Sequence, residues 1–423
     1  MNCEDVPARS HPPLRFLVIQ LARFGDLIQT KRLLRSLQEC GETHLLVDSS
    51  LTALAHIVYP GVRVHGIAAH GTHGPDILAR VYEDLGDIAG LDFHRVYNLN
   101  FSGLSFALAG MFDPSRVRGY RSLRGQRLID SWPGQVMRWT KDRSLTGLNL
   151  VDVWGLYADQ PVSPERVNSA GPDAIPRGGG IGVVMAGQNA RRSLPAQVLA
   201  PLVVAALGRV GRGPIHLLGS GAERRAAREL AALLPAKLRG EVRDLVGRTG
   251  WRELHDVVGG LDLLVSPDTG TMHLAADLGV PVLAFFLSSA WCHETGPYGR
   301  GHLVLQAARS CAPCLETAPC PHDTACRQVF SDPTVLRHVS GHTGRALAPG
   351  CLVMESGFDA LGLTFTAVAG TDPAAARRSA FRAMAATYAG VPMPGSAVCL
   401  TEETWMRERD WMLPQTLRGR AHD

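Results

Sequence analysis

Short apolar runs alternate with segments of helical periodicity along most of the chain. The run Arg15–Leu21 reads RFLVIQL, and in the following Leu27–Gln38 apolar residues recur every three or four positions. The alternation starts again with an apolar run at Ile181–Met185 and a helical segment at Pro195–Leu207. Such alternation is typical of parallel sheets wrapped by helices. The pattern therefore predicts an α/β protein with two doubly wound domains.

A stretch rich in Pro, Gly and Ser, Asp159–Gly180, predicts the linker between these domains. We expect an N-terminal domain at 14–165, a second domain at 178–340 and a C-terminal appendage of unknown role at 341–423. The appendage is expected to hold two strands and a helix, at Cys351–Met354, Leu363–Val368 and Pro373–Tyr388.

The most informative stretch is Leu261–Phe286, LDLLVSPDTGTMHLAADLGVPVLAFF. Its pattern predicts a buried strand at Leu263–Val265, a polar turn, a helix at Met272–Leu278 and a second buried strand from Val280. Such a unit presents a helix N-terminus at the carboxyl end of a parallel sheet, where free N–H groups and the helix dipole favour an anion. We therefore expect the turn to bind the diphosphate of a nucleotide-sugar.

Composition narrows the class of protein. The 423 residues are 45% hydrophobic with a net charge of +4, which argues against global disorder and does not by itself indicate a nucleic-acid partner. Met1–Pro13 has no apolar core of signal-peptide length, and apolar runs such as Val280–Leu287 are far shorter than the roughly 20 residues that span a bilayer. We expect a protein that is located in the cytoplasm and can contact the inner membrane peripherally. We expect no nucleic acid among its partners.

Four segments together resemble a known family. They are VIQLARFGDLIQTKRLLRSL at Val18–Leu37, HLLGSGAERRAARELA at His216–Ala231, LVGRTGWRELHDVVGGLDLLV at Leu245–Val265, and SPDTGTMHLAADLGVPVLAFF from Ser266, followed by Thr295–Gly299. They are similar to the ADP-heptose:lipopolysaccharide heptosyltransferase family, glycosyltransferase family 9, and the similarity covers about Arg15 to His338. The resemblance implies a GT-B fold, in which two Rossmann-like domains face a cleft.

The resemblance also implies an activity, the inverting transfer of heptose from ADP-heptose to a lipopolysaccharide inner-core or lipid-linked acceptor. One alternative is a family member that acts on another glycan or on a protein. Another is a non-catalytic scaffold that binds a nucleotide-sugar. The segments contain no acidic pair of the DxD type in a donor-like loop, so we expect no divalent cation or other cofactor to be required.

Asp26 is the candidate catalytic residue. Inverting transfer needs a base for the acceptor hydroxyl, and a single carboxylate is sufficient. The resemblance implies that Asp26, in the Gly-Asp pair, is this base. The other interpretation is that Asp26 only caps a helix and complements its dipole.

The candidate donor-binding residues lie in the polar turn and in a loop upstream. Thr269, Gly270 and Thr271 offer backbone N–H groups and hydroxyls to a diphosphate, and the resemblance places Asp268 by the donor's hydroxyls. His273 contacts phosphate or is simply packed. In the loop before Pro195 the resemblance implies a basic residue, here Arg192, as the cation for the leaving diphosphate; the alternatives are Arg191 and a merely solvated loop arginine.

The acceptor candidates lie in a basic segment, Ser115–Arg143. We expect Arg118, Arg121 and Arg124 to attract a phosphorylated, acidic acceptor. Trp132 and Trp139 in the same segment are candidates for contact with a lipid surface or a sugar. The competing interpretation is a solvated basic loop.

Four cysteines form a C-x2-C-x5-C-x5-C cluster at Cys311, Cys314, Cys320 and Cys326. The first pair has the spacing of metal ligands, but the second does not complete the usual pattern. A structural zinc ion and four reduced thiols are the two interpretations.

Overall fold

The computed structural model describes residues 14–70, 85–140, 143, 145–168, 176–185, 190–314, 319–342 and 346–393. The N-terminal segment Met1–Pro13 and residues 169–175 of the expected linker lie outside them. The chain divides into two compact units. Unit one comprises Met1–Ala22 and Leu34–Asp130, and unit two comprises Arg23–Leu33 and Ser131–Asp423.

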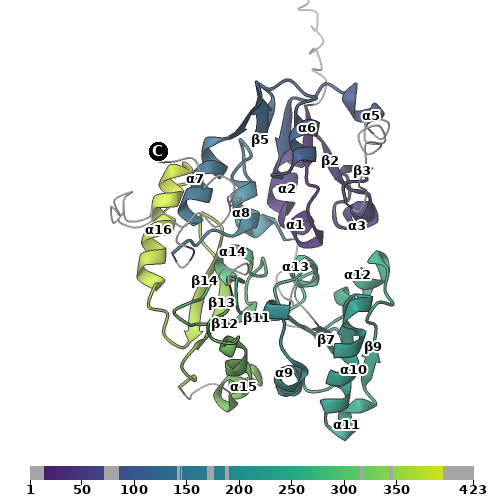
Figure 1. The fold of residues 1–423 in the computed structure, drawn as a ribbon, viewed down its shortest axis with the longest axis vertical. Coiled ribbons are helices and arrows are strands. Elements are labelled where there is room, and N and C mark those ends of the chain that lie inside the picture. Colours follow the sequence, from purple (N-terminus) through teal and green to yellow (C-terminus); the bar gives the residue numbers. More distant parts are fainter. Residues whose placement is uncertain are drawn as a thin grey trace, which may run out of the picture. The chain divides into compact units, whose positions relative to one another are not determined.

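Unit one is built on a six-stranded sheet in the order β3-β2-β1-β4-β5-β6 (Figure 1). Every neighbouring pair is parallel except β5 and β6, which form an antiparallel ribbon. Apolar side chains of its strands and helices form one core, because parallel strands are covered on both faces. Its elements are β1 (Arg15–Ile19), β2 (Glu42–Asp48), α3 (Thr52–Val58), β3 (Arg63–Ile67), α5 (Gly86–Ala89), β4 (Arg95–Asn98), α6 (Gly103–Ala109), β5 (Val117–Leu123), β6 (Gln126–Ile129) and the greater part of α2 (Lys31–Cys40).

Unit two is built on an eight-stranded sheet in the order β14-β13-β12-β11-β10-β7-β8-β9. The strands β7 to β12 are parallel, and buried apolar residues of β7, β8, β10, β11 and β12 form the core with α9 and α15. Its strands are β7 (Ile181–Val184), β8 (Ile215–Leu218), β9 (Val242–Asp244), β10 (Leu263–Ser266), β11 (Val282–Phe286), β12 (Leu303–Ala307), β13 (Cys351–Phe358) and β14 (Leu363–Ala369). Its helices are α1 (Phe24–Gln29), α7 (Ser131–Trp139), α8 (Leu150–Gly155), α9 (Ala196–Val210), α10 (Arg224–Leu233), α11 (Ala236–Arg239), α12 (Trp251–Gly259), α13 (Gly270–Asp277), α14 (Cys292–Thr295), α15 (Pro333–Val339) and α16 (Ala375–Tyr388). The prediction of an α/β fold with two largely parallel sheets is confirmed.

The helix predicted at Leu27–Gln38 is in fact two helices, α1 and α2, which are separated at Thr30. The Thr30 hydroxyl donates to the carbonyl of Asp26 at 2.8 Å, so a local side-chain bond competes with the helical ladder. The prediction of one continuous helix was wrong because apolar periodicity carries no information about this bond. The interruption leaves the first, Asp26-bearing turn as a short separate helix.

Residues of the expected appendage extend the second sheet. Strand β13 pairs antiparallel with β12, and β14 pairs antiparallel with β13. The two strands and the helix expected between residues 351 and 388 are confirmed, although β13 runs on to Phe358 and α16 begins at Ala375. The domain boundaries expected from sequence stay a prediction.

A buried carboxylate ties this extension to the rest of unit two. Asp152 of α8 accepts from Arg32 Nη1 at 2.7 Å, from Tyr298 at 2.6 Å and from the backbone N–H of Leu363 at 2.7 Å. A side chain at Gly362 would lie 2.0 Å from this carboxylate, so glycine is required there. Since Arg32 and Asp152 are both almost fully buried, loss of either one would leave an uncompensated buried charge.

The two tryptophans of the basic segment belong to the interior. Trp132 and Trp139 are only 9% and 4% exposed, and both pack on α16. Trp139 meets Phe381 edge-on at 5.4 Å, and Trp132 stacks with Tyr388 at 6.2 Å. The suggestion that these tryptophans contact a lipid surface or a sugar was therefore wrong.

Candidate functional site

The polar turn after β10 becomes the N-terminus of α13. Thr269 is the N-cap residue, and its hydroxyl accepts from the N–H of Met272 at 3.4 Å and lies 3.0 Å from the Ser266 hydroxyl. The first N–H groups of a helix have no acceptor within the helix, so Gly270 and Thr271 present donors at this end. Both residues are half-buried, and β10 runs parallel to β7 and β11, so the turn lies at the carboxyl edge of the sheet.

Two glycines allow α1 to pack closely on α13 (Figure 1). A Cβ atom at Gly270 would lie 2.2 Å from the Phe24 ring, and one at Gly25 would lie 3.3 Å from the His273 ring. The Phe24 ring also packs edge-on against Trp251 at 5.0 Å. This close approach sets the first turn of α1, which carries Asp26, against the first turn of α13.

Asp26 is half-buried and keeps few partners. The backbone N–H of Arg23 donates to its Oδ2 at 3.2 Å, so the capping interaction expected of this residue is present. Burial raises the pKa of Asp26, while the Arg23 N–H and nearby His273 act in the opposite direction. A carboxylate with a raised pKa is a better proton acceptor than an exposed one.

Asp268 is held more tightly than Asp26. It is 8% exposed, and its Oδ2 accepts from the Thr295 hydroxyl at 2.9 Å and lies 3.6 Å from Arg192 Nη2. Its Oδ1 lies 3.8 Å from His273 Nε2. The Asp268 carboxylate therefore contacts three groups, the Arg192 guanidinium, the Thr295 hydroxyl and the His273 imidazole.

His273 is a buried and neutral imidazole. It is 5% exposed, and burial lowers its pKa to about 4, although Asp26 opposes this shift. At neutral pH the ring therefore offers a hydrogen bond and no positive charge.

Of the two candidate arginines, Arg192 is the one that reaches the turn. Its Nε donates to the Ser289 hydroxyl at 3.1 Å, and its Nη2 faces Asp268. Arg191 instead donates to Cys314 Sγ at 3.3 Å. Ser289 was not among the residues predicted from the sequence. Thr295 stood within a quoted motif, which was the only signal for its contact with Asp268.

The predicted acceptor arginines lie on unit one. Arg118 is in β5, Arg121 pairs with Asp130, and Arg124 occupies the β5–β6 turn with a φ of 50°. The segment Ser115–Arg143 contains this ribbon and α7, so the competing interpretation of a basic loop was wrong. The acceptor role of the three arginines stays a prediction.

The cysteine cluster has free thiols. Cys311 is exposed, whereas Cys314, Cys320 and Cys326 are half-buried. Burial raises the pKa of the Cys326 thiol, and the other three thiols act in the same direction. Within the described ranges no group of three or more His, Cys, Asp or Glu residues is placed to hold a metal ion. Structural zinc stays a prediction.

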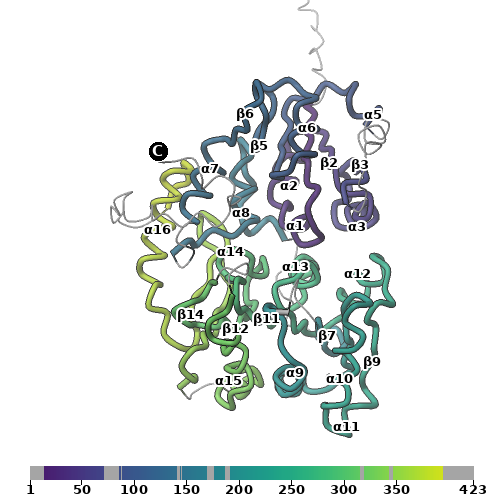
Figure 2. The backbone as a smooth tube through the Cα atoms, viewed as in Figure 1, coloured from purple at the N-terminus to yellow at the C-terminus, as the bar shows by residue number. Residues whose placement is uncertain are grey.

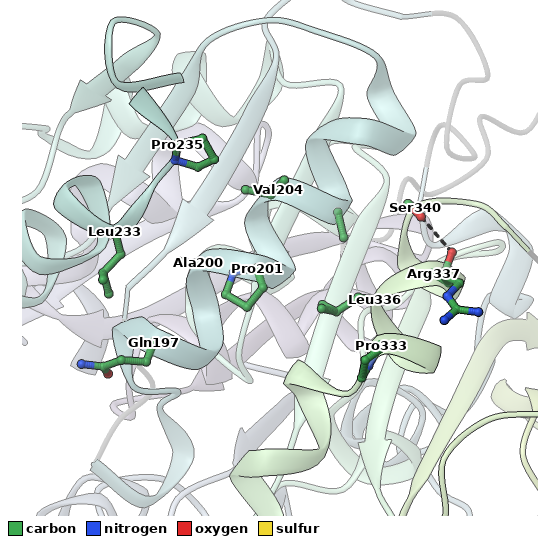
Figure 3. Close-up of a pocket in the computed structure, with 11 residues that line it drawn as sticks. Gln197, Ala200, Pro201, Val204, Leu233, Pro235, Pro333, Leu336, Arg337 and Ser340 are labelled. Carbon is green, nitrogen blue, oxygen red and sulfur yellow. Dashed lines mark hydrogen bonds between the residues drawn. The ribbon is translucent and has the colours of Figure 1, made fainter. Parts of the chain in front are cut away.

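A hollow of about 810 Å³ lies elsewhere in unit two, between α9 and α15 (Figure 3). Ala200, Val204 and Leu336 line it, and none of the predicted site residues does. Its apolar lining is unsuited to a charged diphosphate.

In the part of the chain that the structure describes, no helix is long and apolar enough to span a bilayer.

Comparison with known proteins finds a family domain within unit two. The sequence model of glycosyltransferase family 9 (heptosyltransferase) matches residues 203–323, which include Asp268, the α13 turn and most of the cysteine cluster. A 98-residue stretch is 39% identical to lipopolysaccharide heptosyltransferase 1 of Pseudomonas aeruginosa. That alignment spans 23% of this chain and 26% of the relative, so the chain matches about a quarter of that protein's length. The family resemblance noted in the sequence is confirmed.

Solved structures give the fold. The ADP-heptose lipopolysaccharide heptosyltransferase II of E. coli superposes with a TM-score of 0.52 at 16% identity, over 77% of this chain and 98% of that one. The E. coli heptosyltransferase WaaC with ADP gives 0.51 at 17% identity, over 70% and 93%. The GT-B fold is thereby confirmed.

Proposed function

Because the chain carries a glycosyltransferase family 9 (heptosyltransferase) domain, we propose that it is an inverting glycosyltransferase. The donor is ADP-heptose, and the acceptor is a lipopolysaccharide inner-core sugar. The observation that carries the proposal is the convergence of Asp26, Asp268 and Arg192 around the first turn of α13. At one helix N-terminus, Asp26 can accept a proton, Asp268 can accept hydrogen bonds from hydroxyls, and Arg192 supplies a positive charge.

The donor would bind with its diphosphate at the N–H groups of Gly270 and Thr271. The helix dipole and Arg192 would balance the phosphate charge. Asp268 would accept hydrogen bonds from donor hydroxyls and keep Arg192 in place, since it contacts that guanidinium at 3.6 Å. Neutral His273 would add a hydrogen bond without neutralising Asp26.

Transfer would proceed by a single displacement. Asp26 takes the proton of the acceptor hydroxyl as that oxygen forms a bond to the anomeric carbon of the heptose. The bond from this carbon to the β-phosphate oxygen breaks, and ADP leaves with the electron pair. Arg192 and the α13 N-terminus stabilise the charge that develops on the diphosphate. Burial supports the role of Asp26 because it raises the pKa of the carboxyl and so strengthens the base.

A different acceptor, either another glycan or a protein, leaves the donor half of this scheme unchanged. A nucleotide-sugar-binding scaffold would bind the donor but would show no turnover. The presence of both Asp26 and Asp268, in a geometry that joins them through His273, favours an enzyme over a scaffold.

The experiment is a thermal-shift screen of the full-length chain against ADP-, UDP-, GDP- and CMP-sugars, followed by an assay of ADP release. A ligand that binds only the native state raises the Tm in proportion to its occupancy. ADP-heptose should raise the Tm most, and addition of an inner-core acceptor should release ADP. A larger shift with a uridine or cytidine donor would refute the heptose assignment, and donor binding without ADP release from any acceptor would favour the scaffold.

A further inference from the structure

The segment that follows β11 contacts two of the groups at the α13 turn. We refer to this segment, Leu287–Gly296, which contains α14, as the α14 segment. Near its start the Ser289 hydroxyl accepts from Arg192 Nε at 3.1 Å. Near its end the Thr295 hydroxyl donates to Asp268 Oδ2 at 2.9 Å. Because both contacts come from one segment, a shift of that segment would displace the Arg192 guanidinium and the Asp268 carboxylate together.

The α14 segment is held by the last arginine of the basic segment. Arg143 lies between α7 and α8 in unit two, and its side chain is 13% exposed. Its Nε lies 3.0 Å and 3.1 Å from the two carboxylate oxygens of Glu294, and its Nη2 donates to the same carboxylate. This Nη2 also donates to the backbone carbonyl of Ser289 at 2.7 Å. One guanidinium therefore contacts the α14 segment at both of the places from which it reaches the α13 turn.

Two further contacts lie beside this ion pair. The Thr146 hydroxyl lies 3.3 Å from Glu294 Oε1, and Thr146 is almost fully buried. The amide of Asn149, the N-cap of α8, donates to the carbonyl of Gly296 at 3.2 Å, and α8 and α14 lie side by side in Figure 2. A guanidinium that meets a carboxylate through two nitrogens fixes the orientation of both side chains. The ion pair therefore serves to orient the α14 segment.

The backbone of the α14 segment needs such external contacts. Ser288 has a φ of 61°, in the left-handed region that residues other than glycine rarely adopt. A residue in this region keeps its conformation only when the surrounding structure holds it. The helix α14 has only four residues, so its own hydrogen bonds contribute little. Gln306 of β12 accepts from the backbone N–H of Cys292 at 3.1 Å on the sheet side, and Arg143 contacts the segment before and after that residue.

We propose that Arg143 and Glu294 are positioning residues for the donor. Their ion pair holds the α14 segment so that Ser289 keeps Arg192, and Thr295 keeps Asp268, at the α13 turn. The inference rests on the proposed donor site and extends it to the connection between α7 and α8.

A different role for Arg143 would be attraction of an acidic acceptor, as expected for other arginines of the basic segment. Its guanidinium is already paired with Glu294 and its side chain is largely buried, so this role is disfavoured.

The test is the Kd for ADP of the full-length protein, measured by isothermal titration calorimetry. Arg143→Gln and Glu294→Gln should each raise this Kd about tenfold, a usual coupling between two side chains in contact. The kcat at saturating donor should stay within about threefold of wild type, because neither residue touches the reacting atoms. The double variant Arg143→Gln/Glu294→Gln should also lose about tenfold, since the second substitution removes an interaction that is already broken. Losses that multiply to about a hundredfold would contradict the proposal.

The matched control is Asp359→Asn, which breaks a similar ion pair elsewhere in unit two. The half-buried carboxylate of Asp359 accepts from Arg382 Nε at 2.7 Å and from Nη2 at 2.6 Å. Asp359→Asn should lower the free energy of unfolding, as Glu294→Gln does, but leave the Kd for ADP unchanged. Arg143→Lys keeps the positive charge and loses the planar fork, so it should raise the Kd less than Arg143→Gln does.

The outcomes separate this inference from the proposed function. Wild type that binds neither ADP nor another nucleoside diphosphate would overturn the donor site and this inference with it. Wild type that binds ADP, together with Glu294→Gln that binds it equally well, would overturn the inference alone. An equal loss of ADP binding in Asp359→Asn would also overturn it. A raised KM for acceptor with an unchanged Kd for ADP would assign Arg143 to the acceptor instead.

Discussion

Asp26 and Asp268 are two carboxylates at two neighbouring helix N-termini, and their surroundings differ. Asp26 in the first turn of α1 is half-buried, and its carboxylate accepts a hydrogen bond from the Arg23 backbone N–H. Asp268, just before α13, is 8% exposed and faces a hydroxyl, a guanidinium and an imidazole. The neutral ring of His273 lies 3.8 Å from Asp268 and also interacts electrostatically with Asp26.

The difference indicates that the two carboxylates have different roles. A base must be able to take a proton, so a raised pKa and a sparse set of donors suit Asp26. A carboxylate that contacts a guanidinium and a hydroxyl, as Asp268 does, serves to orient those groups. The same residue type is thus suited to proton transfer at one turn and to donor binding at the other.

The largest expected effect is that of Asp26→Asn. Loss of the base should lower kcat by roughly 10²–10⁴-fold, the usual contribution of general base catalysis, and leave the KM for donor within about twofold. Steady-state ADP release gives both constants. Asp256→Asn, at an exposed position of α12, is the control and should behave as wild type. A kcat for Asp26→Asn within about threefold of wild type would remove Asp26 from the mechanism.

Asp268→Asn should act on binding. The amide is uncharged and no longer pairs with Arg192, so the KM for donor should rise about 10- to 100-fold, as for loss of a charged hydrogen-bond partner. The kcat should change much less than in Asp26→Asn. If Asp26→Asn and Asp268→Asn change kcat and KM by the same factors, the two carboxylates do not have the different roles proposed for them.

Gly270→Ala tests the packing that brings the two turns together. Its Cβ would lie 2.2 Å from the Phe24 ring, so the free energy of unfolding should fall by about 1–3 kcal/mol, the usual cost of overpacking. Chemical denaturation measures this change. Gly103→Ala is the matched control, because Gly103 also begins a helix and nothing lies within 4 Å of a Cβ there. In the double variant Gly270→Ala/Phe24→Ala the second substitution should remove the overlap between the added Cβ and the Phe24 ring. Equal destabilisation by Gly270→Ala and Gly103→Ala would contradict the packing argument.

The smallest effect concerns the pH dependence of stability. Burial lowers the pKa of His273 to about 4, so between its unfolded and folded pKa values the unfolded chain binds the extra proton. The contribution of the neutral ring is present above the unfolded pKa and is lost as the pH falls towards the folded one. Between about pH 7 and pH 5 the loss is about 2 kcal/mol, and His273→Gln should show a correspondingly flatter profile.

His302→Gln is the control for this measurement, because burial lowers the pKa of His302 also to about 4. It should flatten the stability profile similarly but leave ADP release unchanged. The measurement is the unfolding midpoint of wild type, His273→Gln and His302→Gln across this pH range. A profile of His273→Gln as steep as that of wild type would mean that folding does not lower the pKa of His273, contrary to the argument from its burial.

The sequence predicted the strands better than the chemistry of single residues. Parallel strands buried on both faces are continuous apolar runs, and for this reason β1, β7, β10 and β11 were predicted close to their observed bounds. The break at Thr30 was missed because it depends on a side-chain hydrogen bond that periodicity does not report.

The basic segment shows the same limit. Its arginines and tryptophans are adjacent in sequence, which suggested one mixed surface. In the fold, Trp132 and Trp139 pack under α16, and the exposed aromatic residue beside Arg127 is Phe101, which comes from a loop after β4. Adjacency in sequence does not place side chains on one surface, because strands and helices turn neighbouring residues to different faces.

The sequence by itself determined the α/β class, the family resemblance and the helix N-terminus that would receive a diphosphate, because periodicity and short motifs are local properties of the chain. Only the tertiary structure decided that Arg192 rather than Arg191 reaches Asp268, that Thr295 contacts the same carboxylate, and that Asp26 and His273 interact. These contacts join segments far apart in sequence. The interaction of Asp26 with His273 also depends on the close packing of α1 on α13 that Gly25 and Gly270 allow, and no local pattern encodes such a distance.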